Sequence, residues 1–160
     1  MKIMYFIFGI LFFCQSNALE VSCKFEEVYQ NGQIQQGIFL FKDNKIRYQY
    51  NDNNLFTIFY HNDQTYVVSN SDKSNIKKIS KQTDLFQNIV KISKDYPNLS
   101  DNYSFEDVNV SIEKSSNSFF IKRISILSPK VNLSLYFQDC REKNIIDIYF
   151  QPKPYFSYNF

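Results

Sequence analysis

Short segments with strand patterning, separated by turns rich in Asn, Asp and Gly, follow one another from Leu19 to Ser69. Asn31-Gly32 is a strong hairpin signal between the first two segments. In the third, Ile46 alternates with Arg47, so that apolar and polar side chains lie on opposite faces of a strand. This succession predicts an antiparallel meander. Its expected strands are residues 21–29, 34–42, 45–50, 55–60, 65–69 and a short segment at 76–80.

One segment has helical rather than strand periodicity. Thr83 can cap a helix at residues 84–93, whose apolar stripe comprises Leu85, Phe86, Ile89 and Val90. A polar loop is expected at 95–107. The remaining expected strands are residues 108–114, 119–127, 131–139 and 145–151. The sequence therefore predicts a mainly β (α+β) fold, in which one curved antiparallel sheet or incomplete β-barrel is covered by a short helix.

Two of the predicted strands are apolar on both faces. Residues 38–41 read Ile-Phe-Leu-Phe and residues 55–60 read Leu-Phe-Thr-Ile-Phe-Tyr. An antiparallel sheet often exposes one face to water, but such runs need cover on each side. The helix supplies one cover, and we expect a second.

The N-terminus has the pattern of a secretory signal. Lys2 precedes an apolar core at residues 3–13, and small residues lead to a cleavage position after Ala18. A membrane anchor would need about 20 apolar residues. Lipid attachment at Cys14 is disfavoured, because two phenylalanines precede it where small residues are usual. We expect a signal peptide at 1–18, an exported domain at 19–160 and a location outside the cytoplasm.

Two cysteines, Cys23 and Cys140, follow the predicted cleavage position. In an oxidising compartment the simplest expectation is one disulfide that closes a long loop. The alternative is two buried free thiols, because cysteine is also a good core residue.

The sequence contains little that could support catalysis. His61, the single histidine, is expected in a turn and excludes a His-based triad or an HExxH zinc site. With only 3 glycines there is no phosphate-binding loop, and the acidic pair Glu26-Glu27 reads as a solvated face. A formal charge of +2 argues against nucleic-acid binding. We expect neither an enzyme nor a cofactor or metal site.

Apolar surface is the remaining functional signal. With 17 Phe and 12 Tyr in 160 residues, the sheet has more large side chains than one short helix can cover. This favours a ligand cavity or a partner-binding groove. The alternative is an aromatic core that is packed solid.

Residues 37–50, GIFLFKDNKIRYQY, resemble the strand pair G-x-[FL]-x-[FLI]-x-[RK]-P-[GN]-x-[LFI]-R-[WF]-x-Y of the outer-membrane lipoprotein carrier proteins, the LolA-like periplasmic chaperones. Residues 54–68 are similar to that family's next hairpin, 83–90 to its following helix, and 145–154 to its closing strand. Asn44 stands in place of the usual proline and Asp43 in place of a basic residue. The family's long N-terminal helix has no room here.

The resemblance implies a periplasmic carrier whose concave side holds the acyl chains of lipoproteins. It also implies an inner-membrane lipoprotein-releasing transporter and an outer-membrane receptor as partners, and we expect a monomer. Arg47 matches the motif arginine and is expected either to hold a lid or loop or to be an exposed strand residue. The expected cavity residues are Phe39, Phe41, Tyr48, Tyr50, Phe56, Ile58, Tyr60, Leu85, Phe86, Ile89 and Val90.

Two other functions are compatible with the same residues. The first is a secreted β-sheet interaction module that is stapled by Cys23 and Cys140 and has no ligand cavity. The second is a small periplasmic hydrolase whose site carries no recognisable motif.

Overall fold

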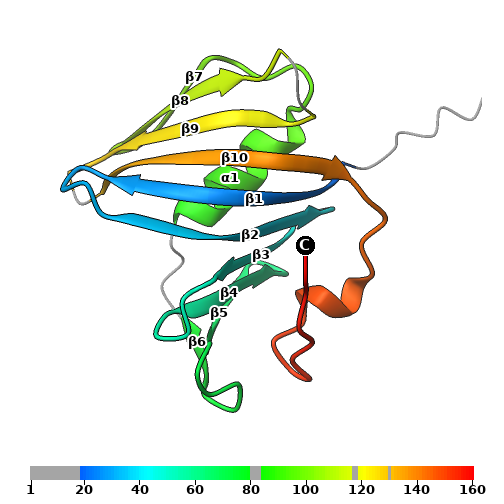
Figure 1. Ribbon diagram of the computed structural model, residues 1–160. Coiled ribbons are helices and arrows are strands. Elements are labelled where there is room, and N and C mark those ends of the chain that lie inside the picture. The colour runs from blue at the N-terminus through cyan, green and yellow to red at the C-terminus, as the bar shows by residue number, and fades with distance from the viewer. Residues whose placement is uncertain (1–18, 80–83, 117–118, 130) are drawn as a thin grey trace, which may run out of the picture.

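The computed structural model describes residues 19–79, 84–116, 119–129 and 131–160, without the side chains of Asp84 and Leu85. Its centre is one open antiparallel sheet of ten strands in the order β6-β5-β4-β3-β2-β1-β10-β9-β8-β7 (Figure 1). The other elements are the helix α1 (Asp84–Lys94) and the short 3-10 helix η1 (Asp147–Phe150). The strands are β1 (Glu20–Tyr29), β2 (Ile34–Lys42), β3 (Lys45–Tyr50), β4 (Phe56–His61), β5 (Gln64–Ser69), β6 (Ile76–Ile79), β7 (Asn102–Phe105), β8 (Val108–Lys114), β9 (Ile121–Leu127) and β10 (Asn132–Glu142).

The predicted mainly-β class and curved sheet are confirmed. Strands β1 to β6 form one meander and β7 to β10 a second, and the pairing of β1 with β10 joins them. Gly37 on β2 permits close packing at this position, because a Cβ there would collide with the Gln49 carbonyl and the Phe25 ring. Cys23 on β1 and Cys140 on β10 form the predicted disulfide across the same junction.

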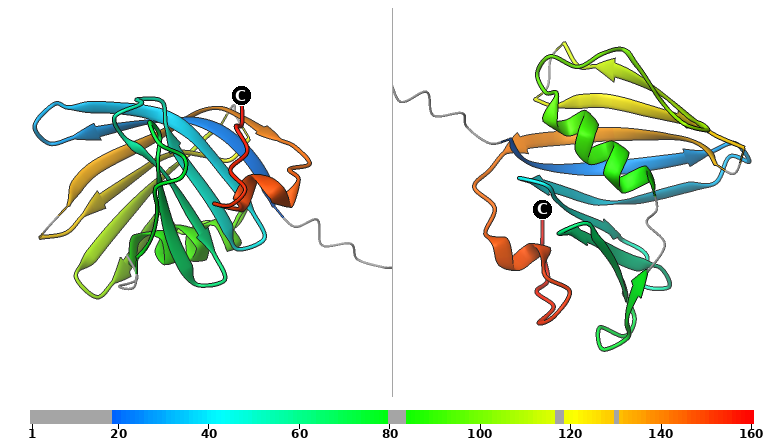
Figure 2. Two further views of the ribbon diagram at one scale, coloured as in Figure 1. Left: turned by 90° about the horizontal axis from the view of Figure 1, so that it is seen from below. Right: turned by 180° about the vertical axis from the view of Figure 1, so that it is seen from behind.

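The sheet curves around α1, which lies in its concave side (Figure 2). Alternate residues of the strands point toward the helix and form the main apolar core. On β2 these are Phe39 and Phe41, and on α1 they are Phe86, Ile89 and Val90. We call the surface formed by the helix-facing side chains of the strands the concave face.

The opposite, convex face of β2 is covered by the chain after β10. Ile38 and Leu40 pack there with Ile145, Phe150 and Tyr158 in a second apolar cluster. This C-terminal segment, residues 143–160, is the second cover that the two-sided apolar strands require. Figures 1 and 2 show it beside β2 to β4, away from α1.

The prediction of a strand at residues 145–151 was wrong. The segment contains η1 and extended chain that lies outside the ten-stranded sheet. The preceding strand β10 already has β1 and β9 as neighbours, so a returning strand has no free edge beside it. The alternating apolar residues pack instead onto the convex face. A second difference is β7, which lies within the polar segment expected to be a loop.

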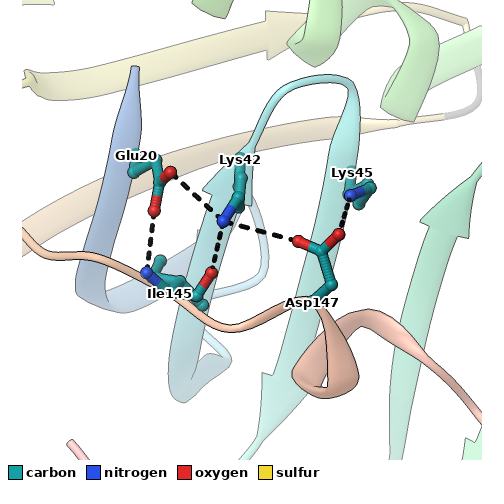
Figure 3. A network of polar contacts seen from close by, with 5 residues as sticks. All are labelled: Glu20, Lys42, Lys45, Ile145 and Asp147. Atoms are coloured by element: carbon teal, nitrogen blue, oxygen red, sulfur yellow. Dashed lines mark hydrogen bonds and ion pairs between the residues drawn. The ribbon is translucent and has the colours of Figure 1, made fainter. Parts of the chain in front are cut away.

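Ion pairs fix the start of the C-terminal segment to β1, β2 and β3 (Figure 3). Lys42 Nζ lies 3.2 Å from Glu20 Oε1 and 3.4 Å from Asp147 Oδ1, and it donates to the Ile145 carbonyl at 2.7 Å. Lys45 Nζ lies 2.9 Å from Asp147 Oδ2. The Ile145 amide donates to Glu20 Oε2 at 2.7 Å. The ammonium of Lys45 holds the pKa of Asp147 below its usual range.

Candidate functional site

The structure brings the predicted cavity residues together on one side of the sheet. Strands β2, β3 and β4 place theirs on the concave face, and α1 directs its own toward that face. Thr83 and the Leu85 side chain lie outside the described residues. The predicted residues found in the concave cluster are Phe39, Phe41, Tyr48, Tyr50, Phe56, Ile58, Tyr60, Phe86, Ile89 and Val90.

These side chains pack against one another beneath the helix. The Phe25 and Tyr48 rings are stacked with centroids 3.9 Å apart, and Tyr48 meets Phe86 of α1 edge-on at 6.1 Å. Phe39 contacts Phe137 of β10 at 5.1 Å. With α1 in place, the concave face is therefore a closed aromatic core along most of its length.

A cavity of about 370 Å³ opens beside the C-terminal end of α1. This volume falls within the usual range of small-molecule sites. Among the predicted residues whose side chains the structure describes, only Phe41 borders it. The other walls combine apolar side chains with the rim residues of the β2–β3 turn and the ends of α1 and β10. The lining residues are Leu19, Phe41, Asp43, Asn44, Ser93, Lys94, Tyr96, Pro97, Phe119 and Glu142.

The apolar walls of the cavity are continuous with the concave core. Leu19, Tyr96 and Phe119 are partly exposed and pack against the main apolar cluster, to which Phe41 belongs. The Ser93 hydroxyl, buried in the wall, has no hydrogen-bond partner. Sequence reasoning missed both Tyr96 and Phe119 as cavity walls. Tyr96 lies in the segment that was expected to be a loop, and Phe119 was expected in a strand, whereas β9 begins at Ile121. The aromatic pair they form, with centroids 5.6 Å apart, links segments that are distant in the chain.

A buried carboxylate lies on the concave face farther along β1. Glu27, only 7% exposed, accepts hydrogen bonds from the hydroxyls of Tyr48 at 2.7 Å, Tyr50 at 2.9 Å and Tyr29 at 2.7 Å. The interpretation of Glu27 as part of a solvated face was wrong. Tyr48 and Tyr50 share one face of β3 by simple alternation, but the pairing of β1, β2 and β3 is needed to place Glu27 beside them.

The tyrosines around Glu27 predict instability at alkaline pH. Burial and then the Glu27 charge raise the pKa of Tyr48 and Tyr50, and burial with the Glu27 hydrogen bond raises the pKa of Tyr29 to about 12. Unfolded tyrosines ionise near about pH 10. Below that pH the tyrosines are protonated in both the folded and the unfolded state, so their ionisation does not change the stability. Above it the unfolded chain loses protons first, so the free energy of unfolding falls as the pH rises from about 10 to about 12.

Urea unfolding at a series of pH values measures this effect. We expect a constant midpoint below about pH 9 and a steady fall above about pH 10. The Glu27→Gln variant lacks the charge that opposes ionisation, so its fall should be shallower. A midpoint that does not change up to about pH 12 would contradict the buried tyrosine cluster.

Arg47 lies on the convex face and is fully buried. Its guanidinium donates to the carbonyls of Tyr149 at 3.1 Å and Phe156 at 2.7 Å, both in the C-terminal segment. It also donates to the Gln49 side chain and the Tyr155 hydroxyl, and it lies 5.2 Å from the Phe59 ring centroid. Burial lowers its pKa. Arg47 therefore holds the C-terminal segment and is remote from α1.

Two other kinds of site were sought among the described residues, a metal site and a helix that could span a membrane. Within them no group of three or more His, Cys, Asp or Glu side chains is placed to hold a metal ion. His61 ends β4 rather than lying in the turn that follows. In the same part of the chain, no helix has the length and apolar character needed to cross a membrane.

Comparison with known proteins does not assign a family. No protein-family model matches the chain, and no curated protein matches it in sequence. The function must therefore be argued from the concave face and its cavity.

Proposed function

We propose that this protein is a periplasmic carrier that shields the acyl chains of lipoproteins, or of a related lipid, on its concave face. The observation that carries the proposal is the pairing of a broad aromatic face with a partly apolar cavity at the end of its single helical cover. The LolA-like resemblance of residues 37–50 points to the same activity.

The physical requirement for such a carrier is modest. Each methylene removed from water contributes about 0.8 kcal/mol, so partial shielding makes a long acyl chain transportable. An acyl chain that enters beside Phe41 and Phe119 meets apolar surface continuous with the core beneath α1. Beyond the cavity the concave face is covered by Phe86, Ile89 and Val90 of α1, so the cavity is where an acyl chain first finds apolar contact.

The cellular setting of the proposal follows from the sequence. The disulfide between Cys23 and Cys140 is typical of an oxidising compartment, as the signal-like N-terminus predicts. In that setting the carrier receives cargo from an inner-membrane lipoprotein-releasing transporter and delivers it to an outer-membrane receptor. Delivery requires the concave face to bind acyl chains less tightly than the receptor does.

A charged substitution at the cavity tests the proposal. Phe119→Glu places a carboxylate on a partly exposed wall of the cavity, and we expect its affinity for a fluorescent long-chain fatty acid to fall at least tenfold. The matched control is Phe156→Glu. It makes the same change at a ring that is 38% exposed, in the C-terminal segment. We expect the control to bind like the wild type.

Two outcomes contradict the carrier function. One is wild-type protein that binds no fatty acid and contains no lipid when it is purified without detergent and examined by native mass spectrometry. Such a protein would support the disulfide-stapled interaction module. The other is equal binding by both variants, which would place the ligand away from this cavity.

A further inference from the structure

A second cavity, of about 440 Å³, lies on the other side of α1, away from the proposed acyl site. Its walls are the exposed flank of the helix, the β7–β8 turn and the chain that follows β9. Phe105 and Val108 form its apolar part and pack against the main core. None of its lining residues borders the first cavity, so its role does not depend on acyl-chain binding.

Asn88 gives this cavity an unused hydrogen-bond donor. The side chain lines the cavity and is only 4% exposed, yet its Nδ2 atom has no hydrogen-bond partner. A buried amide without a partner destabilises a fold, and leucine at this position would avoid that cost. Nδ2 has less than 1 Å² of accessible surface, so a ligand with an acceptor oxygen would satisfy it once the Asn88 side chain turned toward the cavity.

The charges around Asn88 are divided between two walls. Lys91 lies one turn later on α1, with its Nζ 5.5 Å from the Phe105 ring centroid. The exposed carboxylates of Glu106 and Asp107 belong to the β7–β8 turn. The helix side therefore offers an amide and an ammonium group, and the turn side offers two anions. A purely anionic ligand would meet repulsion from the turn, whereas a zwitterion complements both walls.

We propose that this cavity binds a zwitterionic ligand with a phosphate or carboxylate at one end and a primary amine at the other. The acidic oxygens accept hydrogen bonds from Asn88 and Lys91, and the amine pairs with Glu106 and Asp107. The phosphoethanolamine group has this chemistry, whether it is free or forms the head of a lipid.

Calorimetric titration with three probes tests the proposal. We expect glycerophosphoethanolamine and dihexanoyl phosphatidylethanolamine to bind, and dihexanoyl phosphatidylglycerol, which lacks the amine, to bind at least tenfold more weakly. Equal affinity for the first two probes identifies the free zwitterion as sufficient. A lipid that binds at least tenfold more tightly than the free head group identifies the lipid as the natural source.

Two variants separate a ligand site from a structural one. Asp107→Asn should weaken glycerophosphoethanolamine binding at least tenfold without weakening phosphatidylglycerol binding. Asn88→Leu should raise the Tm of the ligand-free protein and also weaken glycerophosphoethanolamine binding at least tenfold. The matched control, Asn44→Leu, lies at the first cavity and should leave this binding unchanged.

Three results overturn the proposal. The first is the absence of binding by glycerophosphoethanolamine, and the second is equal affinity for the two dihexanoyl lipids. The third is an Asn88→Leu variant with a raised Tm and unchanged affinity, which would make Asn88 a structural defect without a ligand. Failure of the fatty-acid test at Phe119 leaves the two measurements with glycerophosphoethanolamine interpretable, because the free head group has no acyl chain.

Discussion

Replacing Arg47 with methionine is expected to lower the free energy of unfolding by about 3 kcal/mol and to release the C-terminal segment. The guanidinium is fully buried and donates to two carbonyls of that segment, those of Tyr149 and Phe156. Methionine fills similar space but donates no hydrogen bond, so both carbonyls lose this donor at a partly buried site. The contacts that remain include the ion pairs around Lys42, the convex apolar cluster and the hydrogen bond from Tyr158 to Ser22, so we expect the chain around Tyr155 and Phe156 to loosen most.

Urea unfolding and limited chymotrypsin digestion measure these two effects. The digestion should cut after Tyr155 or Phe156 in the variant much faster than in the wild type. Arg123→Met is the matched control, because Arg123 on β9 has a side chain that is 40% exposed and pairs with Glu113 on the surface. Its expected loss is below about 1 kcal/mol. Equal losses in the two variants would show that Arg47 does not anchor the segment.

Removing the disulfide is expected to have the largest effect on stability. Cys23 and Cys140 are 117 residues apart in sequence, and closing a loop of about that length is worth up to about 4.7 kcal/mol in the chain-entropy description. The bond also joins β1 to β10, the one pairing that unites the two meanders. We therefore expect the Cys23→Ala, Cys140→Ala double variant to lose about 4 kcal/mol.

The double variant and the reduced wild type should unfold at similar urea concentrations. Adding reductant should change the wild type but not the variant, which serves as its own control for general effects of the reagent. If the double variant loses less than about 1 kcal/mol of unfolding free energy, the bond does not restrict the unfolded chain to the extent that the loop length predicts.

Local patterns were sufficient to predict most of the sheet. The turn at Asn31-Gly32 and the alternation around Arg47 correctly predicted the hairpins of β1 to β3. Hydrophobic periodicity also predicted α1, because residues 85–90 contain one apolar stripe. The two-sided apolar runs correctly required a cover on each face of the sheet.

The failures arise where distant segments decide the outcome. Residues 145–151 have the pattern of a strand, but β10 already has neighbours on both sides, which only the pairing of β1 with β10 reveals. Glu27 reads as a surface residue until the register of β1, β2 and β3 brings it under Tyr48 and Tyr50. Tyr96 lies in a loop, where periodicity predicts nothing, and Phe119 was expected in a strand that begins only at Ile121, so neither was predicted as a cavity wall.

The location of a bound acyl chain tests the central claim most directly. Isoleucine methyl groups of a deuterated protein can be observed by NMR with a protonated fatty acid, and intermolecular NOEs then report direct contact. We predict NOEs from the acyl chain to Ile46, Ile89 or Ile92 in the concave cluster and none to Ile38 and Ile145 in the convex cluster. NOEs confined to the convex isoleucines, or absent from both groups, would contradict a carrier that uses its concave face.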